Sequence, residues 1–305
     1  MAEKRGKILV IRGGAIGDFI LTLPAISALR QNFPDTHLEL LAYPRVAELA
    51  QAAGIVDAFR SIESRPLARF FARKAELDDA WSEYFESFNV ILSYLFDPDD
   101  IFKTNIARTT KAQFIQAQHR PAESQDLHAT AVFLKPLERL AIFSADPVPR
   151  LTLSHSDELS GQWLAIHPGS GSETKNWPEA NWIDLLRNIL DRRSANVLLV
   201  GGEAEGDRLE RIQSAVPRER VQLARNLSLS SLAQLLVQCR AFAGHDSGIT
   251  HLAAAVGIPS LCLWGPTKQN IWRPLGANVR LLNATNSDLT NLEVPFVQSA
   301  LEQLF

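Results

Sequence analysis

The sequence contains the same local pattern twice: a short apolar run, a glycine-rich loop, and then a segment whose apolar residues have helical spacing. The first copy, KILVIRGGAIGDF, begins at Lys7, and the second, WLAIHPGSGSETKNW, begins at Trp163. A strand, a loop and a helix in this order start a βαβ unit, which needs a parallel sheet covered by helices on both faces. Two such starts in one chain predict two similar α/β domains.

The rest of the chain continues this alternation of strands and helices. A proline-rich and then hydrophilic stretch near residues 145–162 separates the two series, so we expect domains at 1–155 and 156–305. Val294–Phe305 is expected to form a last helix, and its packing against the first domain is left open. The predicted strands are Lys7–Ile11, Leu38–Ala42, Val90–Phe96, Leu164–His167, Val197–Gly201, Ala241–Ala243 and Ser260–Leu263.

Composition narrows the class of protein. The chain has 305 residues, of which 46% are hydrophobic and 21% charged, as in ordinary soluble globular proteins. A net charge of -3 argues against a general polyanion binder, so no nucleic acid partner is expected. No apolar stretch reaches the roughly 20 residues that span a bilayer, and no signal peptide is recognised. We therefore expect a cytoplasmic protein, with peripheral contact to the inner membrane left open.

The first glycine loop is followed by a carboxylate, Asp18, where the dinucleotide fingerprint G-x-G-x-x-G would have its last glycine. Asp18 falls near the start of the predicted helix, so one interpretation is an N-capping aspartate. The other interpretation is a functional carboxylate, because the glycines around it allow a ligand to approach the backbone closely.

The second glycine loop is rich in hydroxyl groups and contains a lysine. Backbone N–H groups and hydroxyls around Ser170 and Gly171 can bind phosphate oxygens, with Lys175 supplying the charge. The loop is not a P-loop, because G-x-x-x-x-G-K-[ST] is absent. The alternative is a solvated loop that carries one surface lysine.

A third segment, GHDSGITHLAAA, predicts an anion site at the start of a helix. Asp246 or Ser247 can cap a helix that begins at Gly248, and the N–H groups through Ile249 would then face a pyrophosphate. His251 lies one turn inside this helix, where it can reach the same ligand or pack as a core imidazole. In a fourth segment, VLLVGGE, the carboxylate of Glu203 suits a ribose hydroxyl, and the alternative is a turn residue.

These four segments, in this order, resemble the bacterial lipopolysaccharide heptosyltransferases of glycosyltransferase family 9. The resemblance rests on VIRGGAIGD, HPGSGSETKNWP, GHDSGITHLAAA and LWGPT, and it covers nearly the whole chain. It implies a GT-B fold, with two facing Rossmann-like domains and a cleft between them. It also implies an ADP-sugar donor, commonly ADP-heptose, on the C-terminal domain. The acceptor would be a lipid-linked lipopolysaccharide core on the N-terminal domain, and the sugar would be transferred with inversion and without a metal or other cofactor.

The resemblance also implies roles for single residues. The family's aspartate in the N-terminal glycine loop matches Asp18, which would be the general base. Its lysine before W-P matches Lys175, which would stabilise the leaving ADP together with the helix start after Asp246. Further matches on the donor side are Asp246, His251, Glu203 and Leu227. For Leu227 an ordinary core leucine remains the alternative to packing on adenine.

Basic residues in the first domain are the acceptor candidates. Arg65, Arg69 and Arg73 are four residues apart, so on an α-helix they would share one face. Such a face can bind an acidic acceptor or an anionic membrane, and the alternative is a solvated helix surface. Arg120 matches a region that precedes the family's acceptor-side helix.

Three features depart from the family pattern or bear on other functions. Asp97-Pro-Asp99-Asp100 contains a D-x-D, which we interpret as an acidic loop and not as a metal site. Lys268 stands where the family often has an acidic residue, and the first loop reads G-G-A where a serine-rich version is commoner. Two other functions stay open, a non-catalytic nucleotide-sugar binder and a Rossmann-fold enzyme that modifies nucleotide sugars.

Overall fold

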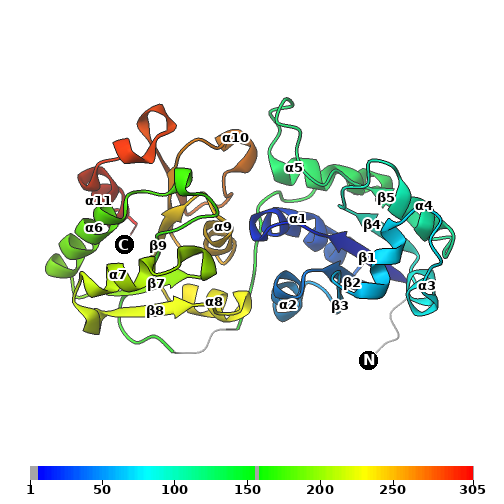
Figure 1. Ribbon diagram of the computed structural model, residues 1–305, viewed down its shortest axis with the longest axis horizontal. Helices are drawn as coiled ribbons and strands as arrows, with labels where there is room; N and C mark the ends of the chain where they lie inside the picture. Colours follow the sequence, from blue (N-terminus) through cyan, green and yellow to red (C-terminus); the bar gives the residue numbers. More distant parts are fainter. Residues whose placement is uncertain (1–5, 155–157, 305) are drawn as a thin grey trace. The chain divides into compact units, whose positions relative to one another are not determined.

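The computed structural model describes residues 6–154 and 158–304, and it forms two compact units, Met1–Pro147 and Val148–Phe305 (Figure 1). Each unit is a parallel sheet with helices between its strands. The predicted α/β class with two parallel-sheet domains is therefore confirmed. Among the described residues, no helix combines the length and the apolar composition that crossing a membrane requires.

The first unit has a five-stranded parallel sheet in the order β3-β2-β1-β4-β5. The order reverses between β1 and β4, so the carboxyl ends of these two strands form the topological switch point where α/β sheets bind ligands. The strands are β1 (Lys7–Arg12), β2 (His37–Ala42), β3 (Ala58–Ser61), β4 (Val90–Ser93) and β5 (Gln113–Gln116). The helices are α1 (Ile16–Asn32), α2 (Pro44–Ala52), η1 (Arg65–Phe71), α3 (Asp79–Glu86), α4 (Ile101–Ala107), α5 (Ala129–Leu134) and η2 (Lys135–Leu140).

The second unit has a six-stranded parallel sheet in the order β11-β10-β9-β6-β7-β8. Its switch point lies between β6 and β9. The strands are β6 (Trp163–His167), β7 (Asn196–Gly201), β8 (Val221–Arg225), β9 (Ala241–His245), β10 (Ser260–Trp264) and β11 (Val279–Asn283). The helices are η3 (Glu173–Lys175), α6 (Glu179–Arg192), η4 (Glu203–Glu205), α7 (Arg208–Ser214), η5 (Arg218–Arg220), α8 (Leu229–Leu236), α9 (Gly248–Ala255), α10 (Gln269–Trp272), η6 (Thr285–Ser287), η7 (Leu289–Asn291) and α11 (Val294–Glu302).

Burial in the first unit explains why β1 and α1 follow the glycine loop so closely. Ile8–Ile11 is buried in the central strand, and α1 buries most of its residues, including Pro24. Helix α1 packs against α5, and a helix that is apolar on nearly all sides is expected to be covered in this way. The glycine loop is therefore anchored at both ends by buried elements.

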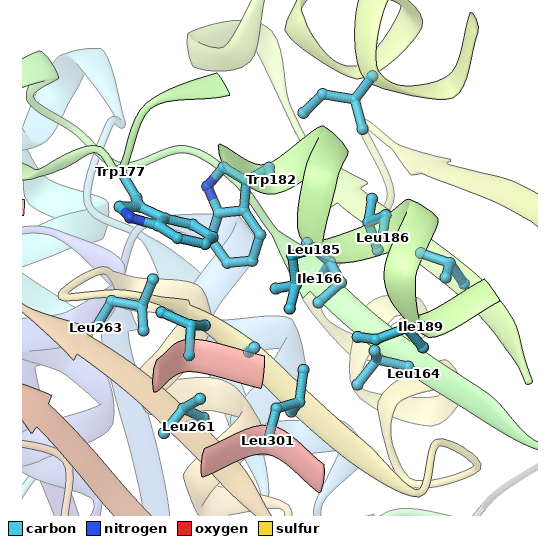
Figure 2. Packing of buried hydrophobic residues seen from close by; sticks show 14 of the residues in the cluster. Leu164, Ile166, Trp177, Trp182, Leu185, Leu186, Ile189, Leu261, Leu263 and Leu301 are labelled. Carbon is cyan, nitrogen blue, oxygen red and sulfur yellow. The ribbon is translucent and has the colours of Figure 1, made fainter. Parts of the chain in front are cut away.

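The core of the second unit is built on β6, α6 and the last helix (Figure 2). Trp177 and Trp182 pack edge to face, with ring centroids 5.0 Å apart, next to Ile166 of β6. Leu301 of α11 belongs to the same cluster, and α11 packs against α6. The last helix thus places its apolar side chains in its own unit, whereas the sequence left open a packing against the first domain.

All seven predicted strands are present, and the described part of the chain contains four further strands that were not predicted. These are β3, β5, β8 and β11, which are the edge strands of the two sheets. Their residues are partly exposed, so their sequences lack the continuous apolar runs of the central strands.

Candidate functional site

The second unit brings its candidate residues together at the carboxyl ends of neighbouring strands. The loop after β6 and the start of α9 lie side by side because β6 pairs with β9, with His167 opposite Gly244. The segments after β7 and β8 continue along the same edge. This edge includes the switch point of the sheet, which is where ligands bind in folds of this kind.

Lys175 and Asp246 form an ion pair across these two loops. The Nζ atom of Lys175 donates to Oδ2 of Asp246 at 2.7 Å, with exposed side-chain fractions of 32% and 10%. The alternative of a freely solvated surface lysine is therefore wrong. The pair joins the end of η3 to the residue before the α9 cap, so a cation stands next to a helix start.

Helix α9 begins as the sequence predicted, with Ser247 as its cap. The Oγ of Ser247 accepts the N–H of Thr250 at 3.3 Å, and the helix starts at Gly248. The predicted positions of Gly248 and Ile249 in the first turn are confirmed, which leaves their N–H groups without an intrahelical acceptor. The start of α9 therefore has the chemistry of an anion site.

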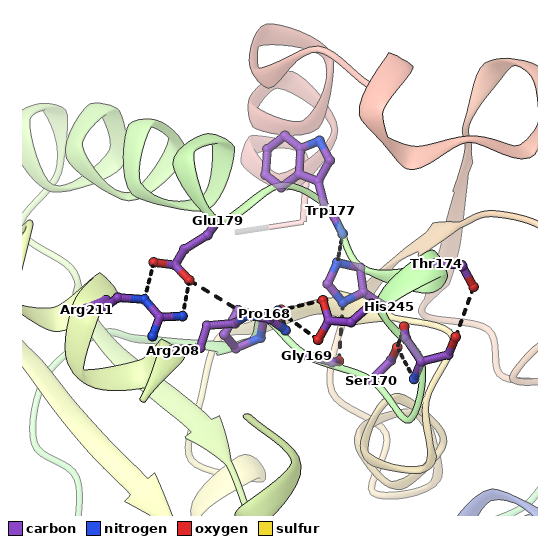
Figure 3. Close-up of polar contacts among 11 residues, drawn as sticks. Pro168, Gly169, Ser170, Thr174, Trp177, Glu179, Arg208, Arg211 and His245 are labelled. Atoms are coloured by element: carbon purple, nitrogen blue, oxygen red, sulfur yellow. Dashed lines mark hydrogen bonds and ion pairs between the residues drawn. The ribbon is translucent and has the colours of Figure 1, made fainter. Parts of the chain in front are cut away.

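A buried histidine, His245, fixes the backbone of the second glycine loop (Figure 3). The N–H of Trp177 donates to its Nε2 at 2.8 Å, and its Nδ1 lies 3.2 Å from the carbonyl oxygen of Gly169. Burial lowers the pKa of His245 to about 3. The ring is therefore neutral, with the proton on Nδ1, and it bridges both ends of the loop.

A second buried chain of polar groups connects Glu205, His167 and Ser247. Glu205 Oε1 lies 3.4 Å from Nε2 of His167, and Nδ1 of His167 lies 3.2 Å from Oγ of Ser247. Glu205 also accepts the N–H of Gly202 at 2.6 Å. Burial alone would raise the pKa of Glu205, but the hydrogen bonds from His167 and Gly202 outweigh burial and lower it. The chain therefore couples the loops after β6, β7 and β9.

Glu205 also explains why residue 169 is a glycine. A Cβ atom built on Gly169 would lie 2.2 Å from Oε1 and 2.6 Å from Cγ of Glu205, which is inside van der Waals contact. The loop is also held from the side of α7, where Arg208 pairs with Glu173 at 2.9 Å. A carboxylate and a guanidinium thus brace the same loop from two elements.

The other predicted donor-side residues lie along this edge in different environments. Ser170 is buried, and its Oγ donates to the carbonyl of Ser172 at 2.8 Å, while Gly171 is exposed. Glu203 is exposed, as a residue that meets a ligand can be. Leu227 is 42% exposed, so the alternative of an ordinary core leucine is wrong. His251 is buried, in agreement with the alternative of a packed imidazole, and its predicted contact with a ligand stays a prediction.

Sequence reasoning missed three residues that organise this edge: His167, Glu205 and His245. Each is polar and buried. The available signal was a polar residue at the end of an apolar strand for the two histidines, and a second carboxylate two residues after Glu203 for Glu205. Which of the two carboxylates turns inward is decided by the hydrogen bonds to Gly202 and His167, which sequence spacing does not reveal.

In the first unit, Asp18 lies in the first turn of α1 after the glycine loop. The N-cap residue is Ala15, and Asp18 is the third residue of the helix, so the interpretation of Asp18 as the N-cap itself is wrong. Its Oδ2 instead accepts the N–H of Ala15 at 3.3 Å, which is the back-bonding contact of a capping box. Gly14 has a φ of 99°, which favours glycine, and a Cβ there would lie 3.1 Å from Asp18 Oδ2. Asp18 is partly exposed, which leaves its carboxylate available to a ligand as well.

The base of the first loop is held by a buried arginine, Arg12, at the end of β1. Its guanidinium donates to the carbonyls of His119 at 2.8 Å, Asp18 at 3.2 Å and Tyr94 at 3.5 Å. It also lies 4.6 Å from the ring centre of Phe133. Burial lowers the pKa of Arg12, and the charge of Asp18 opposes that shift. One side chain thus ties together the loops after β1, β4 and β5.

The expected basic helix face is wrong. Arg65–Phe71 forms the 3-10 helix η1, which ends before Arg73. Positions four apart on a 3-10 helix, such as Arg65 and Arg69, point about 120° apart because each turn has three residues. Arg73 instead pairs with Asp99 at 3.0 Å. Arg65 and Arg69 are exposed, so each remains an acceptor candidate by itself.

The acidic D-x-D loop has a structural role at the start of α4. Asp97 accepts the N–H groups of Phe102 and Lys103 at 3.1 and 2.9 Å, and Asp100 pairs with Lys103 at 3.4 Å. Asp99 is the partner of Arg73. Within residues 6–154 and 158–304, no group of three or more His, Cys, Asp or Glu is placed to hold a metal ion.

A family model and a related protein both indicate a heptosyltransferase. Residues 49–297 match the family model described as glycosyltransferase family 9 (heptosyltransferase). The chain is 26% identical over 288 residues to lipopolysaccharide heptosyltransferase 1 of Pseudomonas aeruginosa, which spans 86% of this chain and 79% of that protein.

Solved structures of Escherichia coli heptosyltransferase WaaC share the fold. The structure with ADP has a TM-score of 0.77 at 17% identity and covers 98% of this chain and 100% of that one. The structure with ADP-2-deoxy-2-fluoro heptose has a TM-score of 0.76 at 18% identity, covering 97% and 99%. The likeness confirms the predicted fold class, two parallel-sheet α/β domains of the GT-B type.

Proposed function

Because the chain belongs to glycosyltransferase family 9, the heptosyltransferase family, we propose that it transfers heptose from an ADP-sugar to a hydroxyl of a lipopolysaccharide core or a related glycan. The names of its relatives support this donor and this acceptor, since one is a lipopolysaccharide heptosyltransferase and another was solved with an ADP-heptose analogue. The observation that carries the proposal is the Lys175–Asp246 pair beside the capped start of α9.

The donor diphosphate would bind at the carboxyl ends of β6 and β9. The N–H groups of Gly248 and Ile249 and those around Ser170 and Gly171 would donate hydrogen bonds to its oxygens, as helix starts and glycine loops do for phosphates. Lys175 would add a positive charge. The braced backbone of the loop supports this assignment, since preorganised donors stabilise charge without having to move during the reaction.

The nucleoside would lie toward β7 and β8. Leu227 follows β8 with an exposed apolar side chain, which suits the face of an adenine ring. Glu203 follows β7 with an exposed carboxylate, which suits the ribose hydroxyls. The buried Glu205 is already occupied by His167 and Gly202, and it would position the loop without touching the ligand.

The reaction would be a single displacement with inversion. The acceptor oxygen forms a bond to C1 of the sugar as the bond from C1 to the diphosphate oxygen breaks, and ADP leaves with both electrons of that bond. Asp18 would accept the proton of the attacking hydroxyl. The negative charge that develops on ADP would be stabilised by Lys175 and the α9 start, so the mechanism needs no metal.

On the acceptor side, exposed arginines would bind anionic groups of a lipid-linked or phosphorylated glycan. Arg120 lies 3.9 Å from Glu123 with much of its side chain exposed, and Arg65 and Arg69 are exposed on η1. An acceptor that carries a lipid would bring these residues near a membrane surface, where anionic headgroups offer the same chemistry.

The proposal is tested by replacing Asp18 and a matched aspartate. Asp18→Asn removes the base, and we expect turnover of ADP-heptose with core acceptor to fall about 10²–10⁴-fold, while thermal stabilisation by ADP stays unchanged. Asp78 also lies at a helix start, where it accepts the N–H of Trp81 at 3.0 Å. Asp78→Asn should leave turnover unchanged, because Asn caps as well as Asp.

Three outcomes would count against the proposal. If Asp18→Asn retains full turnover, Asp18 is not the base. If the wild-type protein is stabilised by ADP but transfers no sugar from ADP-sugars to any core acceptor, the function is that of a nucleotide-sugar binder. Activity that disappears in excess chelator would overturn the metal-free mechanism.

A further inference from the structure

Two aromatic side chains lie at the carboxyl ends of β4 and β5, outside the roles assigned above. The ring centroids of Phe96 and His119 are 4.7 Å apart with the planes tilted by 58°. Phe96 is 67% exposed, and His119 is exposed as well. A large apolar ring held against a second ring, yet open to solvent, is a surface on which a ligand can pack.

The pair belongs to the same framework as Asp18. The Arg12 guanidinium bonds to the backbone carbonyls of both Asp18 and His119, at 3.2 and 2.8 Å. It also reaches the carbonyl of Tyr94, two residues before Phe96. Since one planar group binds all three carbonyls, the backbone segments that carry Phe96, His119 and Asp18 lie close together beside the switch point of this sheet.

The exposure of Phe96 is not by itself evidence that its side chain binds a ligand. Phe143 of the same unit is 78% exposed, and isolated apolar residues on a surface are common. Phe143, however, follows the 3-10 helix η2, whereas Phe96 follows β4 and contacts the ring of His119, whose backbone carbonyl accepts a hydrogen bond from Arg12. The difference lies in what surrounds the ring, and this makes Phe143 a suitable control.

The chemistry of the pair fits a sugar ring. The face of an aromatic ring is electron-rich, and it complements the C–H groups on the apolar face of a pyranose, whose hydroxyls point outward. Partial burial lowers the pKa of His119, the charges of Arg12 and Arg120 lower it further, and the charge of Asp18 opposes these shifts, so the neutral imidazole is favoured. The neighbouring guanidinium of Arg120 can meet an acidic substituent of the same glycan.

We propose that Phe96 and His119 form a platform on which a sugar ring of the acceptor stacks, so that its attacking hydroxyl is directed to Asp18. The inference rests on the proposed function, because it assigns part of the acceptor site of that reaction. Phe96 and His119 act as positioning residues, and the proton still goes to Asp18.

The test uses Phe96→Ala with Phe96→Trp as the conservative variant and Phe143→Ala as the control. Removing a stacked ring is expected to raise the KM for the acceptor by about tenfold or more, as loss of an aromatic stacking partner does elsewhere. The donor KM and thermal stability should stay within about twofold and about 1 °C, since the ring is exposed. Phe96→Trp should restore the acceptor KM, and Phe143→Ala should not change it.

A binding measurement separates failure of the platform from failure of the proposed function. Delipidated lipopolysaccharide core oligosaccharide is titrated into each variant and followed by saturation-transfer NMR, which requires no turnover. Weaker binding by Phe96→Ala alone supports the platform, even if no transfer occurs. Equal binding by wild type and Phe96→Ala, or no binding to the wild type, overturns it, whereas loss of turnover in Asp18→Asn would still support the proposed function.

Discussion

The two glycine loops begin with similar sequences but are held in different ways. The loop after β6 is braced by several buried groups: His245 bridges Gly169 and Trp177, while Glu205 contacts His167 and Gly202. The loop after β1 depends on one buried side chain, Arg12, and on the contact between Asp18 and Ala15.

This difference matches the two proposed tasks. A diphosphate site gains from donors that are fixed before the ligand arrives, because fixed dipoles do not reorganise as charge develops. A base needs a carboxylate that stays partly exposed and accessible to a hydroxyl. We therefore expect that the first loop loses its conformation when Arg12 alone is replaced. In the second loop, we expect the effect of one substitution to be shared among the hydrogen bonds of His245 and Glu205.

The largest expected effect comes from Arg12→Met. The change removes the donors to three carbonyls and the contact with Phe133, and it should lower the free energy of unfolding by about 3 kcal/mol or more. Urea denaturation followed by circular dichroism measures this loss. Arg108 is exposed and bonds to Ala75 and Asn105, so Arg108→Met should cost much less. Equal losses would mean that Arg12 is not the main brace of the first loop.

A somewhat smaller effect is expected for Lys175→Met, and it should appear in catalysis. Loss of the charge beside the leaving diphosphate should reduce turnover about a hundredfold, which corresponds to about 2.7 kcal/mol in the transition state. Steady-state kinetics with saturating donor measures the change. Lys175→Arg keeps a cation near Asp246 and should retain more activity than Lys175→Met. A fully active Lys175→Met enzyme would remove Lys175 from the mechanism.

A matched pair of glycines tests the packing of the second loop. Gly169→Ala places a methyl group against Glu205, and we expect it to cost about 2 kcal/mol and to weaken stabilisation by ADP. A Cβ on Gly171 meets nothing within 4 Å, so Gly171→Ala should be nearly neutral. Thermal denaturation with and without ADP compares the two. Similar behaviour of both variants would show that Glu205 does not restrain the loop.

The last expected effect is a pH dependence from His245, which is small near neutral pH and grows as the pH falls. An unfolded histidine has a pKa of about 6.5, while burial holds the folded His245 at about 3. Between these values the unfolded state binds more protons, so the stability contributed by His245 is complete above about pH 6.5 and falls as the pH falls, by up to about 1.4 kcal/mol per pH unit. Urea unfolding from about pH 6.5 to 4.5 should give a steeper loss for wild type than for His245→Gln. Equal slopes would show that His245 is protonated in the folded state.

The central architecture could be predicted from the sequence, but the sheet edges could not. Central strands such as β1 and β6 are buried on both faces, so they appear as continuous apolar runs next to glycine loops. Edge strands such as β5, with the sequence QFIQ, are partly exposed and carry no such run. Edge strands such as these can be recognised only in the structure, where the neighbouring strand provides the partners of their backbone hydrogen bonds.

In the candidate site, too, the local features could be predicted from the sequence and the features that depend on the fold could not. Chain order alone placed a helix cap at Asp246 or Ser247 and Lys175 in a glycine loop, because caps and loops depend on neighbouring residues. The face shared by Arg65, Arg69 and Arg73 was predicted wrongly, since residue spacing did not reveal that Arg65–Phe71 forms a 3-10 helix, in which Leu67 and Phe70 are buried.

The sequence by itself determined the two α/β units, their glycine loops and the family to which the chain belongs, because these follow from local periodicity and short motifs. Only the tertiary structure decided that Glu205, and not Glu203, is buried beneath the second loop, and that Arg12 joins Asp18 to His119. The physical reason is that a buried polar group must find its partners wherever the fold brings them, as Arg12 does with His119, which is 107 positions away in the chain.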